Sequence, residues 1–215
     1  MPDLVLMAGA ALLGPFGAFG KMPSLGDFFR LDVPPGFTST WDGWLSGVLP
    51  VARTQLGPRW QDCYYNAPIW RFSLAPGLVG RHAVVGVMMP SVDRVGRAFP
   101  LSLVAPVSQA GPEMHMAMAK GFEALETVAL AALEFSMTQA DLRDRLEVLS
   151  GEFEAMSAPT PEIPEAFSAA GAAGFWSALD GERVDYMATR DLPDAGTFCA
   201  MLDRADPRWR AEVEA

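Results

Sequence analysis

Few side chains in this sequence are suited to nucleophilic catalysis. The chain has only two histidines, His82 and His115. A hydrolase needs a serine or cysteine nucleophile, a histidine base and an acid that orients the base. Neither histidine has such partners close in sequence, so we expect both to be partly exposed structural residues and assign no catalytic residue. Folding could still bring distant groups together, and a hydrolase using Ser91 or Cys63 with His82 is the alternative hypothesis.

The sequence favours neither metal nor nucleotide binding. Cys63 and Cys199 are far apart and have no metal-ligand spacing, so we expect buried thiols, a reducing compartment and no metal site. The glycine-rich stretch before Lys21 is not a phosphate loop, because Pro15 stands where that motif needs glycine and Met22 where it needs Ser or Thr. We therefore expect no cofactor.

Pairs of acidic residues occur in segments with helical periodicity. We expect them on solvated helix faces, because a calcium loop requires an alternating acidic pattern around a central glycine. The pairs are Glu123 with Glu126, Asp141 with Asp144, and Glu152 with Glu154.

The densest group of hydrogen-bonding side chains follows the apolar run 83–89 and contains Ser91, Asp93, Arg94 and Arg97. One interpretation is that Asp93 caps a turn and pairs with Arg94 or Arg97, which holds two strands in register. The other is that the arginines present a bidentate surface for a carboxylate of a partner protein.

Apolar spacing predicts the elements that position this loop. Glycines alternating with aromatics over 14–20 predict a strand with close neighbours. Apolar residues at intervals of three and four over 41–56 predict a helix, with Thr38 or Ser39 as N-cap and Pro50 kinking or dividing it. Three apolar runs predict consecutive strands covered on both faces. These are Ile69–Ala75, Ala83–Met89 and Phe99–Val107.

The second half begins with helical patterns. An apolar stripe from Met114 to Leu133 predicts one helix, and 138–154 predicts another, with Thr138 as its N-cap and Asp141 in its first turn. Residues 158–173, rich in Pro, Ala and Gly, predict a mobile connection. Two strands at 175–179 and 184–188 and a helix at 195–204 complete an α/β fold, with a mixed, largely antiparallel sheet and helices on both faces.

Composition narrows the class of partner. The chain of 215 residues carries a net charge of −10, and residues 111–215 hold 20 of its 26 acidic groups. This charge repels nucleic acid and anionic lipid, whereas it favours a basic protein surface. The apolar segment 4–13 has no basic residue before Lys21 and is shorter than a membrane span, so we expect an N-terminal extension over 1–13.

Four segments together resemble the TagF family of type VI secretion accessory proteins. They are Phe19-Gly-Lys-Met-Pro-Ser-Leu-Gly-Asp-Phe28, Trp41-Asp-Gly-Trp-Leu45, Ala67-Pro-Ile-Trp-Arg-Phe72, and Met89-Pro-Ser-Val-Asp-Arg-Val-Gly-Arg97 followed by Phe99-Pro-Leu101. The resemblance covers about residues 16–107 in order, and the last segment is long enough to be specific.

The resemblance implies a cytoplasmic, non-catalytic repressor of type VI secretion that acts after translation by binding a forkhead-associated scaffold protein. It also implies a single domain over 14–215, with a motif-bearing half at 14–110 and an acidic helical half at 111–215. We expect partner contacts at Ser91, Asp93, Arg94, Arg97 and Asp42, without nucleic acid binding or membrane insertion. A structural subunit of the secretion machine is a third possibility, although the chain lacks heptads or repeats.

Overall fold

The computed structural model describes residues 11–158 and 162–209. Its centre is a seven-stranded sheet with the order β2-β1-β5-β4-β3-β6-β7, in which every pairing between these strands is antiparallel. The sheet contains more antiparallel pairing than the sequence led us to expect. The strands are β1 (Gly17–Gly20), β2 (Phe29–Leu31), β3 (Trp70–Leu74), β4 (Ala83–Met89), β5 (Leu101–Val107), β6 (Gly174–Asp180) and β7 (Arg183–Thr189).

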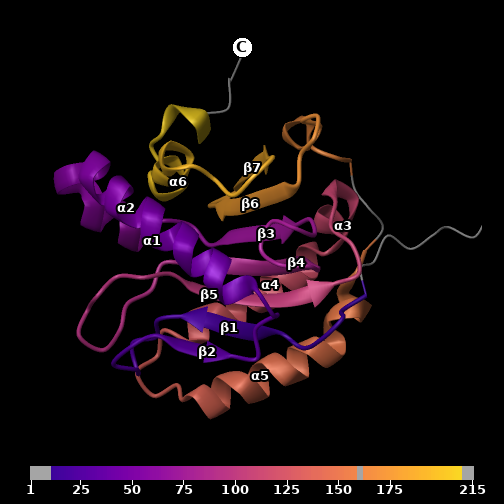
Figure 1. The fold of residues 1–215 in the computed structure, drawn as a ribbon, viewed down its shortest axis with the longest axis horizontal. Helices are drawn as coiled ribbons and strands as arrows, with labels where there is room; N and C mark the ends of the chain where they lie inside the picture. Colours follow the sequence, from indigo (N-terminus) through magenta and orange to yellow (C-terminus); the bar gives the residue numbers. More distant parts are fainter. Residues whose placement is uncertain (1–10, 159–161, 210–215) are drawn as a thin grey trace, which may run out of the picture.

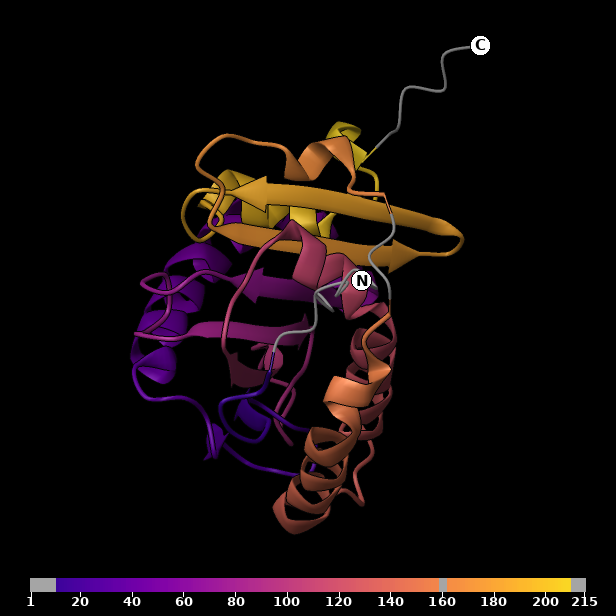
Figure 2. The ribbon, with the colours of Figure 1, turned by 90° about the vertical axis from the view of Figure 1, so that its right-hand side faces the viewer.

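Helices cover both faces of this sheet, as predicted (Figures 1 and 2). One face carries α1 (Phe37–Leu56), η1 (Gly57–Arg59), α2 (Trp60–Asn66), α6 (Ala195–Leu202) and η4 (Pro207–Trp209). The other face carries α3 (Pro112–Ala117), α4 (Ala119–Ala131), α5 (Gln139–Glu152) and η2 (Phe153–Met156). The short η3 (Glu165–Phe167) packs beside β7.

The central strands contribute to two separate cores because their side chains alternate between the faces. Val85 and Val87 of β4 join the core under α4 and α5, whereas Val84 and Met88 join the core under α1 and α6. All seven residues of β4 are buried. The prediction from its continuous apolar run, a strand covered on both faces, is confirmed.

Glycine makes the close approach between β1 and β5 possible. Gly20 has a φ of 137°, and a Cβ at this position would lie 2.1 Å from the Pro100 carbonyl oxygen. The glycine-rich pattern therefore predicted both the strand and its tight contact with a neighbour.

Helix boundaries are where the sequence predictions needed correction. α1 begins at Phe37 after Gly36, so neither Thr38 nor Ser39 is its N-cap, and Ser39 instead donates to the Gly36 carbonyl. Pro50 does not divide α1, because it lies on the exposed side, where solvent can hydrate the carbonyl that loses its amide partner. Near Met118 the expected single helix separates into α3 and α4.

The second half of the chain contains one confirmed cap and one revised connection. Thr138 caps α5 in a capping box with Asp141, as predicted. Within the expected mobile connection, Phe167 of η3 is 3% exposed and lies against Phe175 and Tyr186, so this part is anchored by aromatic packing. Residues 159–161 of the connection lie outside the described residues.

The expected N-terminal extension is described only at its end. Residues 1–10 lie outside the described residues. Leu12 bridges Val107, and Leu13 donates its amide to the Pro106 carbonyl, so residues 12–13 lie along the end of β5. In the described ranges, no helix is long and apolar enough to cross a bilayer.

Candidate functional site

The loop that joins β4 to β5 is a tight turn organised by one carboxylate. Asp93 Oδ1 accepts hydrogen bonds from the amides of Val95 at 3.1 Å and Arg97 at 2.9 Å. The Asp93 carbonyl accepts from the amide of Gly96, whose φ of 82° favours glycine. Because the side chain satisfies the amides at the tip of the turn, the 91–97 loop has a defined shape without regular secondary structure.

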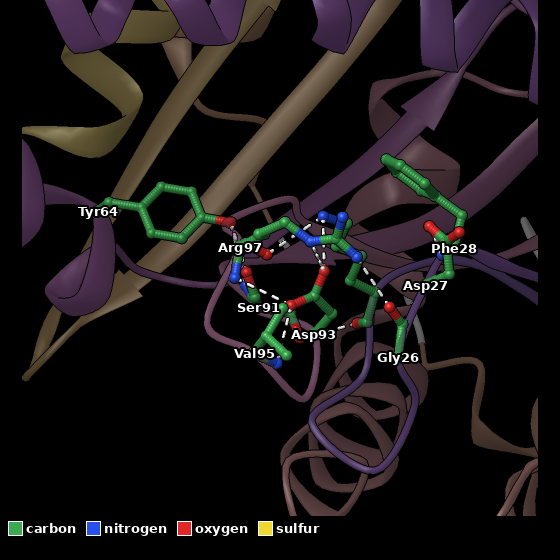
Figure 3. Close-up of polar contacts among 9 residues, drawn as sticks. Gly26, Asp27, Phe28, Tyr64, Ser91, Asp93, Val95 and Arg97 are labelled. Carbon is green, nitrogen blue, oxygen red and sulfur yellow. Dashed lines mark hydrogen bonds and ion pairs between the residues drawn. The ribbon is translucent and has the colours of Figure 1, made fainter.

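The buried Asp93 carboxylate is also the centre of a charge cluster, drawn in Figure 3. Its Oδ2 lies 2.6 Å from Arg97 Nε and 3.0 Å from Lys21 Nζ. The Lys21 ammonium also lies 4.8 Å from the centre of the Phe28 ring. Burial alone raises the pKa of the Asp93 carboxyl, but hydrogen bonds from Arg97 and Lys21 outweigh it and hold that pKa well below its usual range.

Both arginines of the loop reach the segment that follows β1. Arg97 Nη2 donates to the Gly26 carbonyl, and Arg94 Nη2 donates to the Ser24 carbonyl, each at 2.8 Å. The interpretation in which Asp93 caps the turn and pairs with one of the two arginines is therefore confirmed, and the arginine is Arg97. Arg94 instead donates to a backbone carbonyl. The Arg97 side chain remains 59% exposed, so its guanidinium is held in place and faces solvent. Its contact with a partner carboxylate stays a prediction.

Ser91 is buried and holds the loop from beneath. Its hydroxyl donates to the Lys21 carbonyl at 2.8 Å. Its carbonyl accepts from the Tyr64 hydroxyl, also at 2.8 Å, which ties α2 to the base of the loop. Desolvation raises the pKa of Tyr64 and keeps this phenol protonated. Ser91 and Asp93 therefore position the exposed arginines, and they present little surface of their own.

A groove of about 720 Å³ lies beside the loop, which we call the α1–α2 groove. Its walls come from the second half of α1, from η1 with α2, and from the loop itself. Leu49, Arg53, Trp60, Tyr65, Gly96 and Arg97 are among the residues that line it. Asp42, the remaining predicted contact, lies about three turns before Arg53 on α1 and does not line this groove.

The residues of the hydrolase hypothesis are not brought together. His82 precedes β4 and Ser91 follows it, so a strand of seven residues, about 20 Å long, separates them. His82 Nε2 instead accepts a hydrogen bond of 2.8 Å from Arg81 Nε. Cys63 is on α2, and burial raises the pKa of its thiol, which disfavours the nucleophilic thiolate.

A buried polar cluster that the sequence did not reveal surrounds His115. Its Nδ1 lies 2.5 Å from Ser73 Oγ and its Nε2 lies 2.8 Å from Ser177 Oγ. The ring is 2% exposed, which corrects the expectation of a partly exposed histidine. Burial, together with the nearby Arg71 charge, lowers the pKa of His115 to about 3. At neutral pH the uncharged ring joins β3, α3 and β6 through one donated and one accepted hydrogen bond.

Two further sequence expectations, for Glu126 and Cys199, change in the structure. Glu126 is not on a fully solvated face, because it forms a two-point ion pair with Arg71 at 2.6 and 2.9 Å. Cys63 is buried as expected, whereas Cys199 is only partly buried. Among the described residues, no group of three or more His, Cys, Asp or Glu side chains could hold a metal ion.

Lys21, Tyr64 and Arg53 are the site residues that sequence reasoning missed. Lys21 gave a local signal, since a lysine among apolar residues of a strand end needs a buried counter-ion. Tyr64 and Arg53 gave none, because their roles depend on how two helices meet a distant loop.

Comparison with known proteins places this geometry in a family. No curated protein matches the chain significantly. Among solved structures, PA0076 from Pseudomonas aeruginosa PAO1 is similar, with 29% sequence identity and a TM-score of 0.63 over 87% of this chain and 93% of that one. The family model described as the TagF N-terminal domain, type VI secretion system-associated, matches residues 17–149. This range includes β1, α1, α2 and the whole 91–97 loop. The chain therefore belongs to the TagF family associated with type VI secretion.

Proposed function

We propose that this protein is a cytoplasmic negative regulator of type VI secretion that acts after translation, by binding a forkhead-associated scaffold protein of the secretion apparatus. It works as a non-catalytic binding protein within a single domain over residues 14–215. Membership of the family supports the setting, and the shared sheet, which pairs β3 of the first half with β6 of the second, supports one folding unit.

The observation that carries the proposal is that the Arg97 side chain is both fixed by hydrogen bonds and exposed to solvent. Its Nε is bound to buried Asp93 and its Nη2 to the Gly26 carbonyl, yet more than half of the side chain faces solvent. A guanidinium that is already fixed loses little conformational entropy when it binds a carboxylate, and it binds with defined geometry. Arg94 is also exposed, and its Nη2 donates to the Ser24 carbonyl.

In this proposal Ser91 and Asp93 hold the loop in place, whereas Arg94 and Arg97 contact the scaffold protein. Asp42 is half-exposed on α1 and would extend the contact along that helix. The acidic second half of the chain adds long-range attraction to a partner with a basic surface.

Calorimetric titration of the purified protein with the purified scaffold protein from the same organism tests this function. We expect saturable binding that weakens at least tenfold in the double variant Arg94→Glu with Arg97→Ala. Arg145→Glu is the matched control, since it changes an exposed helical arginine on α5 and should keep wild-type affinity. Circular dichroism confirms that each variant is folded.

Two results would overturn the proposal. Absence of scaffold binding by the folded wild-type protein removes the partner, and undiminished binding by the double variant removes the loop as the contact.

In cells, deletion of the gene should raise the amount of secreted type VI substrate in the medium, and overproduction should lower it. Asp42→Asn, measured in the same titration, tests whether the contact reaches along α1.

A further inference from the structure

The α1–α2 groove carries positive charge in a protein that is otherwise strongly acidic. Arg53 and Arg97 line it, and none of its lining residues is acidic. The chain as a whole has a net charge of −10. The groove is therefore a local site of attraction for anionic groups on a molecule whose net charge is negative.

The two arginines still have capacity to bind. Arg53 is exposed and, among the described residues, has no acidic side chain within ion-pair distance. Arg97 uses Nε for Asp93 and Nη2 for the Gly26 carbonyl, which leaves Nη1 available (Figure 3). Because Lys21 and Arg97 share the single negative charge of Asp93, the cluster under this wall keeps a net positive charge.

Two of the residues that line the groove, Trp60 and Tyr65, are aromatic. Trp60 stacks on Tyr64 with ring centres 5.0 Å apart, and Tyr65 meets Tyr64 edge to face at 5.6 Å. Tyr65 is 56% exposed, so its ring is accessible from solvent. Such rings offer rigid contact area with few rotatable bonds, as in recognition surfaces for polypeptides.

Hydrogen bonds hold the groove walls in place without a ligand. The Tyr64 hydroxyl donates to the Ser91 carbonyl, so α2 is joined directly to the base of the loop. Pro50 and Pro58 lie in the lining and restrict the backbone of the two helical walls. A volume of about 720 Å³ accommodates several residues of an extended chain.

We propose that the α1–α2 groove binds an acidic peptide segment of a partner protein. Two of its carboxylates pair with Arg53 and Arg97, and an apolar side chain near them packs on Trp60 and Tyr65. This inference rests on the proposed function, since it assigns the segment to the scaffold protein and states the chemistry by which that protein is recognised.

Nuclear magnetic resonance titration with an acetylated, amidated hexaglutamate peptide tests the groove without the scaffold. We expect saturable shifts of the Trp60 indole N–H, the Gly96 amide and the Arg53 and Arg97 Nε–H signals. Hexaglutamine and hexalysine peptides should produce no saturable shifts. Arg53→Glu should weaken hexaglutamate binding at least fivefold, whereas Arg145→Glu, an identical charge change on α5, should weaken it less than twofold.

The scaffold titration with Arg53→Glu and with Tyr65→Ala separates this inference from the proposed function. Weaker scaffold binding in both variants supports the groove. Scaffold binding that depends on Arg94 and Arg97 but is unchanged by both groove variants overturns the groove and leaves the proposed function standing. Hexaglutamate shifts that are absent, or that Arg145→Glu reduces equally, also overturn it. A wild-type dimer in light scattering that Arg53→Glu dissociates would assign the groove to a second copy and overturn the hetero-partner.

Discussion

The Lys21 ammonium and the Asp93 carboxylate form a buried ion pair 3.0 Å long between two loops that are distant in sequence. Lys21 follows β1 and Asp93 lies between β4 and β5, with side-chain exposures of 6% and 0%. The pair therefore couples the candidate binding loop to the segment that follows β1.

Replacing Asp93 by asparagine should strongly destabilise the fold. The amide keeps the shape of the side chain but leaves Lys21 buried without a counter-ion, which typically costs about 3–5 kcal/mol. The measurement is the free energy of unfolding by urea. Asp144→Asn, an exposed change on α5, is the control and should stay within about 0.5 kcal/mol of wild type. A loss below about 1 kcal/mol for Asp93→Asn would contradict the buried pair.

A double variant identifies the origin of that loss. If the cost comes from the orphaned lysine, Lys21→Met combined with Asp93→Asn should be more stable than Asp93→Asn alone, because methionine fills the space without a charge. Equal stability of the single and double variants would instead assign the loss to the hydrogen bonds that Asp93 accepts within its turn.

The His115 cluster should make stability depend on pH above the range in which carboxylates titrate. The folded protein holds the pKa of His115 at about 3, whereas an unfolded histidine has a pKa of about 6.5, so the unfolded chain binds the extra proton between these values. The stabilisation is complete above about pH 6.5 and is lost as pH falls toward about 3, with a slope of about 1.4 kcal/mol per pH unit for one proton.

His115→Gln removes this titrating group and should flatten the pH dependence of unfolding between pH 6.5 and 5. Urea unfolding at several pH values measures the slope, and His82→Gln shows which of the two histidines accounts for it. An unchanged slope in His115→Gln would refute the assignment. A lower stability of this variant at pH 8 is expected as well, because glutamine replaces only part of the Ser73 and Ser177 hydrogen bonds.

Local patterns predicted the frame of the molecule, because strand burial and helix caps depend on neighbouring residues. The run 83–89 predicted a strand covered on both faces, and Thr138 with Asp141 predicted the start of α5. The contacts of His115 with Ser73 and Ser177 span 42 and 62 residues and left no periodic signal. Only the packing of α3 over β3 and β6 creates them.

Only part of the candidate site could be predicted from the sequence, namely the loop and not the groove beside it. The polar composition of 91–97 indicated a turn organised by Asp93 with Arg94 or Arg97 as its partner, and the structure shows that the partner is Arg97. The groove depends on Arg53 of α1, a helix that the sequence predicted, and on Tyr65 of α2, a helix that it did not predict. Residue types therefore indicated the loop that forms one wall of the groove, whereas the groove itself is created by the tertiary fold.

Gly20→Ala should destabilise the protein by about 2 kcal/mol or more. The new Cβ would lie 2.1 Å from the Pro100 carbonyl oxygen, and a φ of 137° is strained for any residue with a Cβ. Gly47→Ala in α1 is the matched control, since no atom lies within 4 Å of its added Cβ. The control should gain up to about 1 kcal/mol from helix propensity. Equal urea midpoints for the two variants would contradict the close packing of β1 on β5.

Thr138→Ala should cost about 1 kcal/mol of unfolding free energy, because it removes the side-chain acceptor of the Asp141 amide at 3.1 Å. The same change should raise the pKa of the Asp141 carboxyl, which the Thr138 hydroxyl and amide now lower. Thr127→Ala in α4 is the matched control, since that hydroxyl donates to the Glu123 carbonyl in a helix interior and alanine has the higher helix propensity. Urea unfolding measures both variants, and nuclear magnetic resonance titration of Asp141 measures its pKa. If the two threonine variants lose equal stability and the Asp141 pKa does not move, the capping box does not set the start of α5.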